Sequence, residues 1–343
     1  MTSSPLNIRI ALKVEYAGGT SVLKSKKKIE RAYEVRFSSG GRYLSVANIR
    51  ESKCFSFSVY GNKELALLAA ETYRRKRSCE LDRTVYYYPT RISIQQRKYI
   101  AGLMDGDGCI RHTGSTISVS IRQSQNDGQP AVIAMLQKLY GGNVVHREAH
   151  GNFRKQHCLE LGGYNCLPVL YDIMPYLVLK PQQARIAYNF LMADSPFTER
   201  ENVFATLRDM KLMDAYQAVP VSVSQLSDPY LSGFFDAEGC VVPHDEAGIA
   251  IEFSQAQSDQ LLVAINEYFG GRGCVKTTIT AFTGDNGYKV AVCITPYSIV
   301  KRSQLEAAIQ LRSICVKHWR LRTDAEREKA VRLREFITSE KHK

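Results

Sequence analysis

Two stretches of the sequence, YIAGLMDGDGCI at residues 99–110 and YLSGFFDAEGCV at residues 230–241, are variants of one pattern. Each pattern predicts a helix with two small residues at the third and fourth positions of the stretch. Each predicted helix ends at an acid that is followed by glycine. Small residues let two helix backbones approach closely, so we expect the two helices to pack against each other. The acids, Asp107 and Glu238, would then lie side by side at the end of the helix pair.

The repetition extends well beyond these helices. Each copy continues with a strand-like stretch ending near a glutamine, a helix closed by Gly-Gly, and the motif Pro-Tyr-x-x-x-Lys with another glutamine three residues on. Corresponding positions are 131 residues apart for the acids, 132 for Gln123 and Gln255, and 121 for Lys180 and Lys301. Features that recur in the same order at similar intervals predict two related halves.

Two carboxylates near helix C-termini repel each other and the helix dipole. A divalent cation would offset that repulsion, and oxygen ligands favour Mg²⁺ or a similar hard ion. Such ions serve phosphodiester hydrolysis by activating water and stabilising the leaving oxygen. A single acid before glycine is commonly just a turn, so the duplication is what favours catalysis. Asp105 and Asp236, two residues earlier, are interpreted as structural groups that bond local backbone and hold the turn.

The net charge of +12 is concentrated in the first quarter of the 343-residue chain. Residues 1–91 carry 18 Lys and Arg against 8 Asp and Glu, and the remaining 252 residues carry 28 against 26. A basic segment favours phosphate, in nucleic acid or at an anionic membrane surface. The plainer alternative is a solvated basic face.

Nine cysteines with no CxxC pair give little support to a zinc site or a disulfide framework, and most are interpreted as small core side chains. We therefore expect a reducing intracellular compartment, whether organelle matrix, nucleus or cytoplasm. No run of 18 apolar residues occurs, so no membrane-spanning helix and no membrane partner are expected.

The N-terminal region alternates in strand fashion over residues 30–60, through RAYEVRFSS, GRYLSVANI and CFSFSVYG, with a turn at Gly40-Gly41. After Gly61 the spacing becomes helical, with an apolar stripe at Leu65, Leu67, Leu68, Ala70 and Tyr73. Three strands and a helix predict a small α+β domain, and residues 81–92 are predicted to be a linker.

IAGLMDGDG (100–108) and LSGFFDAEG (231–239) resemble the two signature helices of LAGLIDADG homing endonucleases. The resemblance covers residues 93–340. It implies an α+β fold in which two pseudo-symmetric αββαββα halves form a DNA-binding saddle, in addition to the N-terminal three-strand-and-helix domain. The domain limits that we expect are 1–92 for the basic accessory DNA-binding domain and linker, 93–205 for the first half, 206–222 for a linker, and 223–343 for the second half.

The resemblance also implies the activity: metal-dependent hydrolysis of both strands of a long DNA target. The metal, Mg²⁺ or Mn²⁺, would be held by Asp107 and Glu238 with the residues before them, Gly106 and Ala237. Gln123, Gln255, Lys180 and Lys301 match positions that the family places around the water and the scissile phosphates, with the glutamine after the second strand and the lysine after the last strand of each half. Because one chain carries both halves, a monomer with internal pseudo-two-fold symmetry is expected on double-stranded DNA.

Alternating polar side chains on the predicted sheets are the candidates for reading base edges in the major groove. They are Arg111, Ser118, Ser120, Arg122, Arg147 and Arg154 in the first half, and His244, Glu252, Arg272 and Lys276 in the second. The bulky Phe234-Phe235 pair further predicts that the helix interface is not symmetric. The N-terminal stretch CFSFSVYGNKELALLAAETYRRKR is similar to an APETALA-type DNA-binding domain.

Two alternatives stay open at this point. One is a non-cutting nucleic-acid binder on the same scaffold, either an intron-splicing maturase with intron RNA as partner or an organellar or transcription factor. The other is an unrelated small-molecule enzyme, which has little support because the sequence contains no Gly-rich phosphate loop, nucleophile elbow or HExxH motif.

Overall fold

The computed structural model describes residues 6–17, 27–39, 50–80, 92–113, 116–124, 128–148, 155–192, 197–210, 220–244, 248–256 and 258–340. The chain divides into two compact units, Met1–Tyr88 with Phe190–Asn202, and Pro89–Asn189 with Val203–Lys343. Within the described ranges, no helix has both the length and the apolar character needed to cross a membrane.

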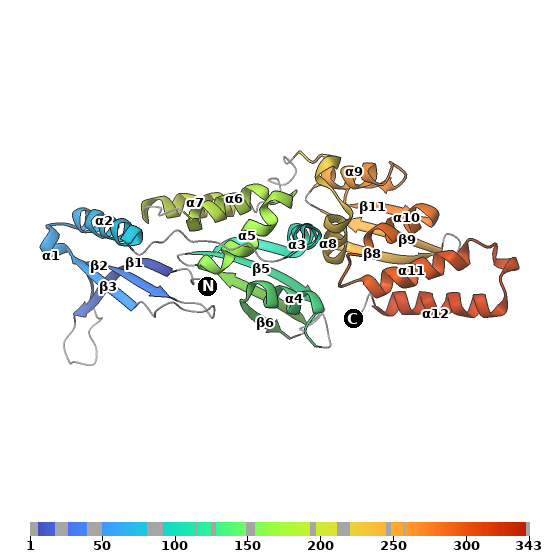
Figure 1. Ribbon diagram of the computed structural model, residues 1–343, viewed down its shortest axis with the longest axis horizontal. Helices are drawn as coiled ribbons and strands as arrows, with labels where there is room; N and C mark the ends of the chain where they lie inside the picture. Colours follow the sequence, from blue (N-terminus) through green and yellow to red (C-terminus); the bar gives the residue numbers. More distant parts are fainter. Residues whose placement is uncertain are drawn as a thin grey trace. The chain divides into compact units, whose positions relative to one another are not determined.

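The first unit contains a three-stranded antiparallel sheet in the order β1-β2-β3, followed by two helices (Figure 1). Phe55 is buried with Ala66 and Ala70, which lie one helical turn apart, and the Tyr73 ring packs 5.5 Å from the Phe55 ring. A three-strand-and-helix domain is thereby confirmed, but its first strand, at residues 6–17, precedes the range 30–60 in which all three strands were predicted. Its elements are β1 (Leu6–Ala17), β2 (Lys27–Ser39), β3 (Arg50–Ser56), α1 (Phe57–Tyr60) and α2 (Lys63–Glu80).

Some details of this unit differ from the prediction. The strand expected to run to Gly61 ends at Ser56, because the next four residues form a helical turn. Leu65 and Leu68, expected in the apolar stripe, are 51% and 60% exposed, because the i, i+4 alanines occupy the buried face instead. The predicted Gly-Gly turn, the strand at 41–49 and most of the linker at 81–92 lie outside the described residues.

The second unit contains one series of elements twice, which confirms the two αββαββα halves. The first copy comprises α3 (Ile94–Asp107), β4 (Gly108–Thr113), β5 (Thr116–Ser124), α4 (Ala131–Tyr140), β6 (Asn143–Arg147), β7 (Gln156–Gly162), α5 (Leu167–Ile173) and α6 (Pro181–Met192). The second copy comprises α8 (Asp228–Glu238), β8 (Gly239–His244), β9 (Gly248–Ser254), α9 (Asp259–Tyr268), β10 (Cys274–Val275), β11 (Ile279–Thr283), α10 (Gly284–Ile294) and α11 (Arg302–Cys315).

The two sheets have the same antiparallel topology, β4-β5-β7-β6 and β8-β9-β11-β10 (Figure 1). The predicted Gly-Gly pairs follow α4 and α9. All four glycines have positive φ, between 70° and 91°, a conformation that L side chains rarely adopt. These pairs therefore let the chain turn sharply from helix to the next strand at matched points of the two halves.

Further helices follow each copy. Helix α7 (Phe197–Asp209) covers the first residues of the segment predicted as a linker, and residues 211–219 of that segment lie outside the described residues. The Phe204 ring of α7 stacks on His112 of the edge strand β4, with centroids 4.9 Å apart. In the second half, α12 (Asp324–Glu340) lies against the edge strand β8. In each sheet, the edge strand that follows the signature helix is therefore in contact with a further helix.

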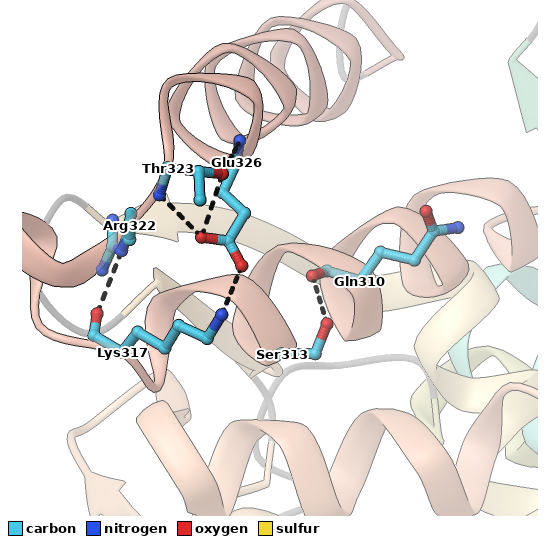
Figure 2. Close-up of polar contacts among 6 residues, drawn as sticks. All are labelled: Gln310, Ser313, Lys317, Arg322, Thr323 and Glu326. Carbon is cyan, nitrogen blue, oxygen red and sulfur yellow. Dashed lines mark hydrogen bonds and ion pairs between the residues drawn. The ribbon is translucent and has the colours of Figure 1, made fainter.

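The connection from α11 to α12 is fixed by polar contacts that converge on Glu326 (Figure 2). Glu326 accepts hydrogen bonds from the Thr323 N–H at 2.8 Å and from the Lys317 ammonium at 2.5 Å. In return, the Glu326 N–H donates to the Thr323 hydroxyl, which completes a capping box at the start of α12. Arg322 closes the turn by donating to the Lys317 carbonyl. The cap fixes the point from which α12 runs back along β8.

Helices α3 and α8 are in backbone contact. A Cβ added to Gly102 would lie 1.9 Å from the carbonyl oxygen of Tyr230, and one added to Gly233 would lie 1.9 Å from that of Tyr99. The predicted close packing of the two helices is therefore confirmed, and it depends on glycine at both positions.

The closest approach of the two helices is equal at Gly102 and Gly233, whereas the asymmetry predicted from side-chain bulk stays a prediction. The Phe235 ring packs 5.3 Å from Phe253, in the core of its own half.

The cysteine interpretation also needs correction, because only three of the eight cysteines with described side chains are buried. The buried ones are Cys158, Cys166 and Cys315, the partly exposed ones are Cys109, Cys240 and Cys293, and Cys54 and Cys274 are exposed.

Candidate active site

The two acids predicted to be catalytic end their helices next to each other. Asp107 is the last residue of α3 and Glu238 the last residue of α8. A Cβ added to Gly106 would lie 2.4 Å from the Ala237 Cβ and 3.1 Å from the Glu238 Cγ. The two helix ends therefore touch, and the structure brings the two carboxylates together as the sequence predicts.

The electrostatics of the pair are those of carboxylates with too little solvent. Burial and, to a lesser extent, the negative charge of Glu238 together raise the pKa of Asp107 to about 7, although Lys301, Lys180 and the hydrogen bond from Gln123 oppose the shift. Burial also raises the pKa of Glu238, again against the two lysines. Burial and a neighbouring acid destabilise the ionised form of this carboxyl. A bound cation would stabilise that form by compensating the charges of both acids.

The glutamines occupy equivalent places in the two sheets. Gln123 is the penultimate residue of β5, inside the strand rather than after it, and its side-chain amide donates a hydrogen bond to the Asp107 carboxylate. Gln255 directly follows β9, and its backbone N–H donates to the Thr278 carbonyl. Gln123 therefore holds one of the acids, as a residue that positions a metal ligand would.

The two lysines bond the ends of the signature helices. The Lys180 ammonium lies 2.7 Å from the Met104 carbonyl oxygen and 2.8 Å from that of Gly108. The Lys301 ammonium lies 2.9 Å from the Phe235 carbonyl oxygen and 2.7 Å from that of Gly239. The Met104 and Phe235 carbonyls already accept the N–H of Gly108 and Gly239, so each ammonium is a second donor there, and a cation at a helix C-terminus also stabilises the helix dipole. Each lysine thus caps the helix that carries an acid.

Burial lowers the pKa of both lysines, and the neighbouring carboxylates oppose that shift. The resemblance implied that each lysine follows the last strand of its half, but neither lysine follows that strand directly. Lys180 comes after α5 and the short 3₁₀ turn Met174–Tyr176, and Lys301 comes after α10. The helices in between bring each ammonium back to its own signature helix.

The aspartates two residues before the acids organise the lysine segments. Asp105 accepts hydrogen bonds from the N–H groups of Val178 at 2.7 Å, Leu179 at 3.0 Å and Lys180 at 3.0 Å. These residues are structural, as expected, but the prediction that they bond local backbone is wrong. The bonded segment lies more than 70 residues further along the chain, so the carboxylate fixes where the lysine backbone approaches the helix.

Asp236 repeats the arrangement in the second half. It accepts from the N–H groups of Ile299 at 2.7 Å, Val300 at 2.9 Å and Lys301 at 3.0 Å, and from the Ser298 hydroxyl at 2.6 Å. A carboxylate that receives several such bonds is well suited to burial. Both lysine segments are therefore anchored in the same way.

Two tyrosines, which the sequence analysis left without a role, link the halves reciprocally. The Tyr99 hydroxyl of α3 donates to Asp236 at 2.7 Å, and the Tyr230 hydroxyl of α8 donates to Asp105 at 2.8 Å. Both tyrosines are buried, and burial raises the pKa of each hydroxyl, with a further rise from the aspartate it contacts. The signal was present, because tyrosine precedes the small residues at the same place in both copies.

A cavity of about 980 Å³ lies at the ends of α3 and α8 and is lined by both halves. Asp107, Gln123, Arg122 and Lys301 line it, together with Glu340 at the end of α12. The cavity is large enough for a phosphodiester group with hydrated ions.

The oxygen donors at the two helix ends fit a hard divalent cation, although of the two acids only Asp107 lines the cavity. Two carboxylates and the backbone carbonyls of Gly106 and Ala237 are oxygen ligands of the kind that Mg²⁺ prefers. Each of these carbonyls also has a lysine ammonium at 3.5 Å, and a carbonyl oxygen has a second lone pair for a further partner. Across the described part of the chain, no three His, Cys, Asp or Glu side chains converge on one point, so water and DNA oxygens would complete the coordination.

The residues expected to read DNA fall into two groups. Ser118 and Ser120 are 7% and 1% exposed, so the expectation of exposed polar side chains is wrong there, because these short side chains are paired with the larger Arg111 and Glu160 on the neighbouring strands. Arg154 lies outside the described residues. The others are at least partly exposed: Arg111, Arg122, Arg147, His244, Glu252, Arg272 and Lys276.

No family model matches the sequence, and no curated protein matches it. Several solved structures do. The meganuclease I-SmaMI, bound to an uncleaved DNA target in the presence of calcium ions, is 12% identical, with a TM-score of 0.48 over 71% of this chain and 98% of that one. The LAGLIDADG meganuclease I-AabMI, bound to uncleaved DNA, is 15% identical, with a TM-score of 0.48 over 70% and 98%.

The LAGLIDADG homing endonuclease I-GzeII, in complex with its DNA target, is 12% identical, with a TM-score of 0.46 over 70% of this chain and 97% of that one. I-AabMI and I-GzeII carry the family name that the two signature helices resemble. Because these TM-scores are below 0.5, the fold is established from this chain's own helices, strand registers and contacts.

The raised pKa of Asp107 predicts how stability depends on pH. The folded-state pKa of about 7 exceeds the ordinary 3.8, so the stabilising contribution of the neutral carboxyl is complete below about pH 4 and is lost as the pH rises through 7. Asp107→Asn is neutral at every pH. In EDTA it should unfold in urea like the wild type near pH 4 but be more stable at pH 8, by at most about 4 kcal/mol.

Mg²⁺ added at pH 8 should narrow that difference by stabilising the wild type more than the variant. The exposed acid Glu267 provides the control, because Glu267→Gln should show neither effect. Equal stability of Asp107→Asn and wild type at both pH values would contradict the shifted pKa.

The reciprocal tyrosine bonds predict coupling between distant positions. Removing a buried hydrogen bond to a charged group costs roughly 1.5–3 kcal/mol. In a double-mutant cycle, Tyr99→Phe and Asp236→Asn should therefore be strongly non-additive in the free energy of unfolding. The matched control pairs Tyr99→Phe with Asp105→Asn, which lies on the same helix but bonds Tyr230. Comparable coupling in both cycles would argue against the cross-helix bond.

Proposed function

We propose that this protein is a site-specific DNA endonuclease of the LAGLIDADG type, which hydrolyses both strands of a long duplex target with a divalent metal. The observation that carries the proposal is the meeting of Asp107 and Glu238 at the crossing of two equivalent helices. One acid comes from each half, and each half presents an equivalent antiparallel sheet on which a duplex half-site can be bound.

The residues of the site divide the work. When bound, Mg²⁺ or Mn²⁺ would lower the pKa of the attacking water and stabilise the leaving oxygen. Asp107 and Glu238, with the carbonyls of Gly106 and Ala237, would hold the cation. Gln123 orients the Asp107 carboxylate. Lys180 and Lys301 fix the helix ends and oppose the upward pKa shifts of both acids, which keeps them available as ionised ligands.

The organisation of the chain supports a monomer on duplex DNA. Both acids lie in one polypeptide, so a second copy is not needed to complete the site. We further propose that residues 1–92 form an accessory domain that contacts DNA phosphates through its excess of 18 cationic residues over 8 acidic ones in residues 1–91. The limits proposed for the two halves are 93–205 and 223–343, with 206–222 between them.

The alternative of a non-cutting binder is not favoured, because both acids are present and lie together in the cavity region. A maturase-like role on intron RNA would leave the two carboxylates without a function.

Cleavage of a supercoiled plasmid library with Mg²⁺ or Mn²⁺ tests the proposal. The wild type should give linear product at defined sequences, and Asp107→Asn and Glu238→Gln should each abolish it, because each removes one of the two charged ligands. Glu335→Gln, an exposed acid on α12, should cut like the wild type. Tight binding of duplex or RNA without cleavage, unchanged by the acid substitutions, would contradict the endonuclease function.

A further inference from the structure

The strand registers define equivalent positions in the two sheets. Gly108 pairs with Ile121 at the start of β4, and Gly239 pairs with Phe253 at the start of β8. Counting from these pairs, position 111 corresponds to 242 and position 122 corresponds to 254. The sheets therefore place these positions at corresponding points on either side of the pseudo-two-fold axis.

These positions lie on the sheet face opposite the core. Along β4 and β5, Ile110, Val119 and Ile121 are buried at 3% exposure or less, whereas Arg111 and Arg122 alternate with them and are partly exposed. In the second half, Val241 and Phe253 are fully buried, whereas the neighbouring residues of β8 and β9 are partly exposed. Side chains two apart on a strand share a face. The face that carries the arginines is thus the one free to meet DNA.

The first sheet presents guanidinium groups with unused donors. Arg111 lies 3.6 Å from Glu160, with both side chains about one third exposed, and an ion pair of that kind contributes little. The Nε atoms of Arg111 and Arg122 are buried and have no hydrogen-bond partner in the described structure, although both side chains are partly exposed. Buried donors without partners are costly unless a ligand supplies acceptors. Base edges in the major groove would do so.

The second sheet has different chemistry at the same places. Val242 replaces Arg111, Ser254 replaces Arg122, and Ala281 stands where the first sheet has Glu160. No guanidinium therefore occupies either of these two positions. An aliphatic side chain in the major groove contacts the thymine methyl, whereas arginine makes paired hydrogen bonds to guanine O6 and N7.

We propose that the two halves read chemically different bases at mirror-related target positions: guanine opposite Arg111 and Arg122 on one side of the centre, and thymine opposite Val242 on the other. Ser254 has only a short hydroxyl side chain. We therefore expect little base preference at the target position opposite Ser254, which mirrors the guanine opposite Arg122. This inference deepens the proposed function and rests on it. It names the residues that make the target unlike a palindrome.

Selection of bound duplexes from a randomised library tests the inference without cleavage. The full chain is used with Ca²⁺ in place of Mg²⁺, and base preferences are read at each position. The wild type should enrich guanine on one side and thymine at the mirror position. Arg111→Val, which installs the residue of the second half, should reduce the preference for guanine at one position by roughly five- to a hundredfold. Arg122→Ser should do the same at a second position.

The reciprocal changes make the test symmetric. Val242→Arg should replace thymine by guanine at the mirror position, and Ser254→Arg should create a guanine preference where there was little. Uracil in place of thymine opposite Val242 should weaken wild-type binding about fourfold, because it removes one methyl contact. Arg332→Val, an exposed arginine on α12, is the control and should change no preference. Thermal unfolding of each variant establishes that it is folded.

Equal base preferences at mirror-related positions, or an unchanged selection by Arg111→Val and Arg122→Ser, would overturn the inference. Failure of the proposed function looks different. Selective duplex binding with the expected asymmetry but without cleavage in Mg²⁺ would contradict the endonuclease and leave the reading of bases intact. A library in which no duplex sequence is enriched would overturn both.

Discussion

The structure of the larger unit depends on the contact between two helix backbones. At Gly102 and Gly233 the opposite helix lies so close that even one added carbon would collide with a carbonyl oxygen. Such a contact fixes the separation of the helices through the main chain, not through flexible side chains. The acids at the two helix ends therefore meet at a distance that the backbone determines, and the geometry needed to share a cation is set before any ion binds.

The buried aspartates extend this constraint to the rest of the site. Asp105 gathers the lysine segment of its own half and receives the tyrosine hydroxyl of the other helix, and Asp236 does the converse. Each lysine then caps the helix that carries an acid. Because the aspartates and tyrosines are buried, the loss of either partner leaves the other without its hydrogen bond and away from water. Neither half forms a complete site by itself.

The sequence predicted the elements of this design better than their connections. The duplication, the glycines at the helix crossing and the acids were recognisable because they recur at similar spacing and serve local geometry. The hydrogen-bond partners of Asp105 were not recognisable from the sequence. They lie more than 70 residues further along the chain, and the fold of the intervening residues decides where they meet Asp105. The burial of Ser120 likewise depends on residues of the neighbouring strands. The exposure of Leu65 depends on which face of its helix packs against the sheet. The unlike chemistry of Arg111 and Val242 became visible only when the registers placed them at equivalent points.

We infer that the helix crossing makes one cation-binding centre from one acid of each half. Mn²⁺ binding to the full chain, followed by electron paramagnetic resonance, tests it without DNA or cleavage. If the two acids share one ion, Asp107→Asn and Glu238→Gln each weaken binding of the same tightly held ion, and the double variant binds that ion more weakly than either single variant. Undiminished Mn²⁺ binding in either single variant would contradict a shared centre.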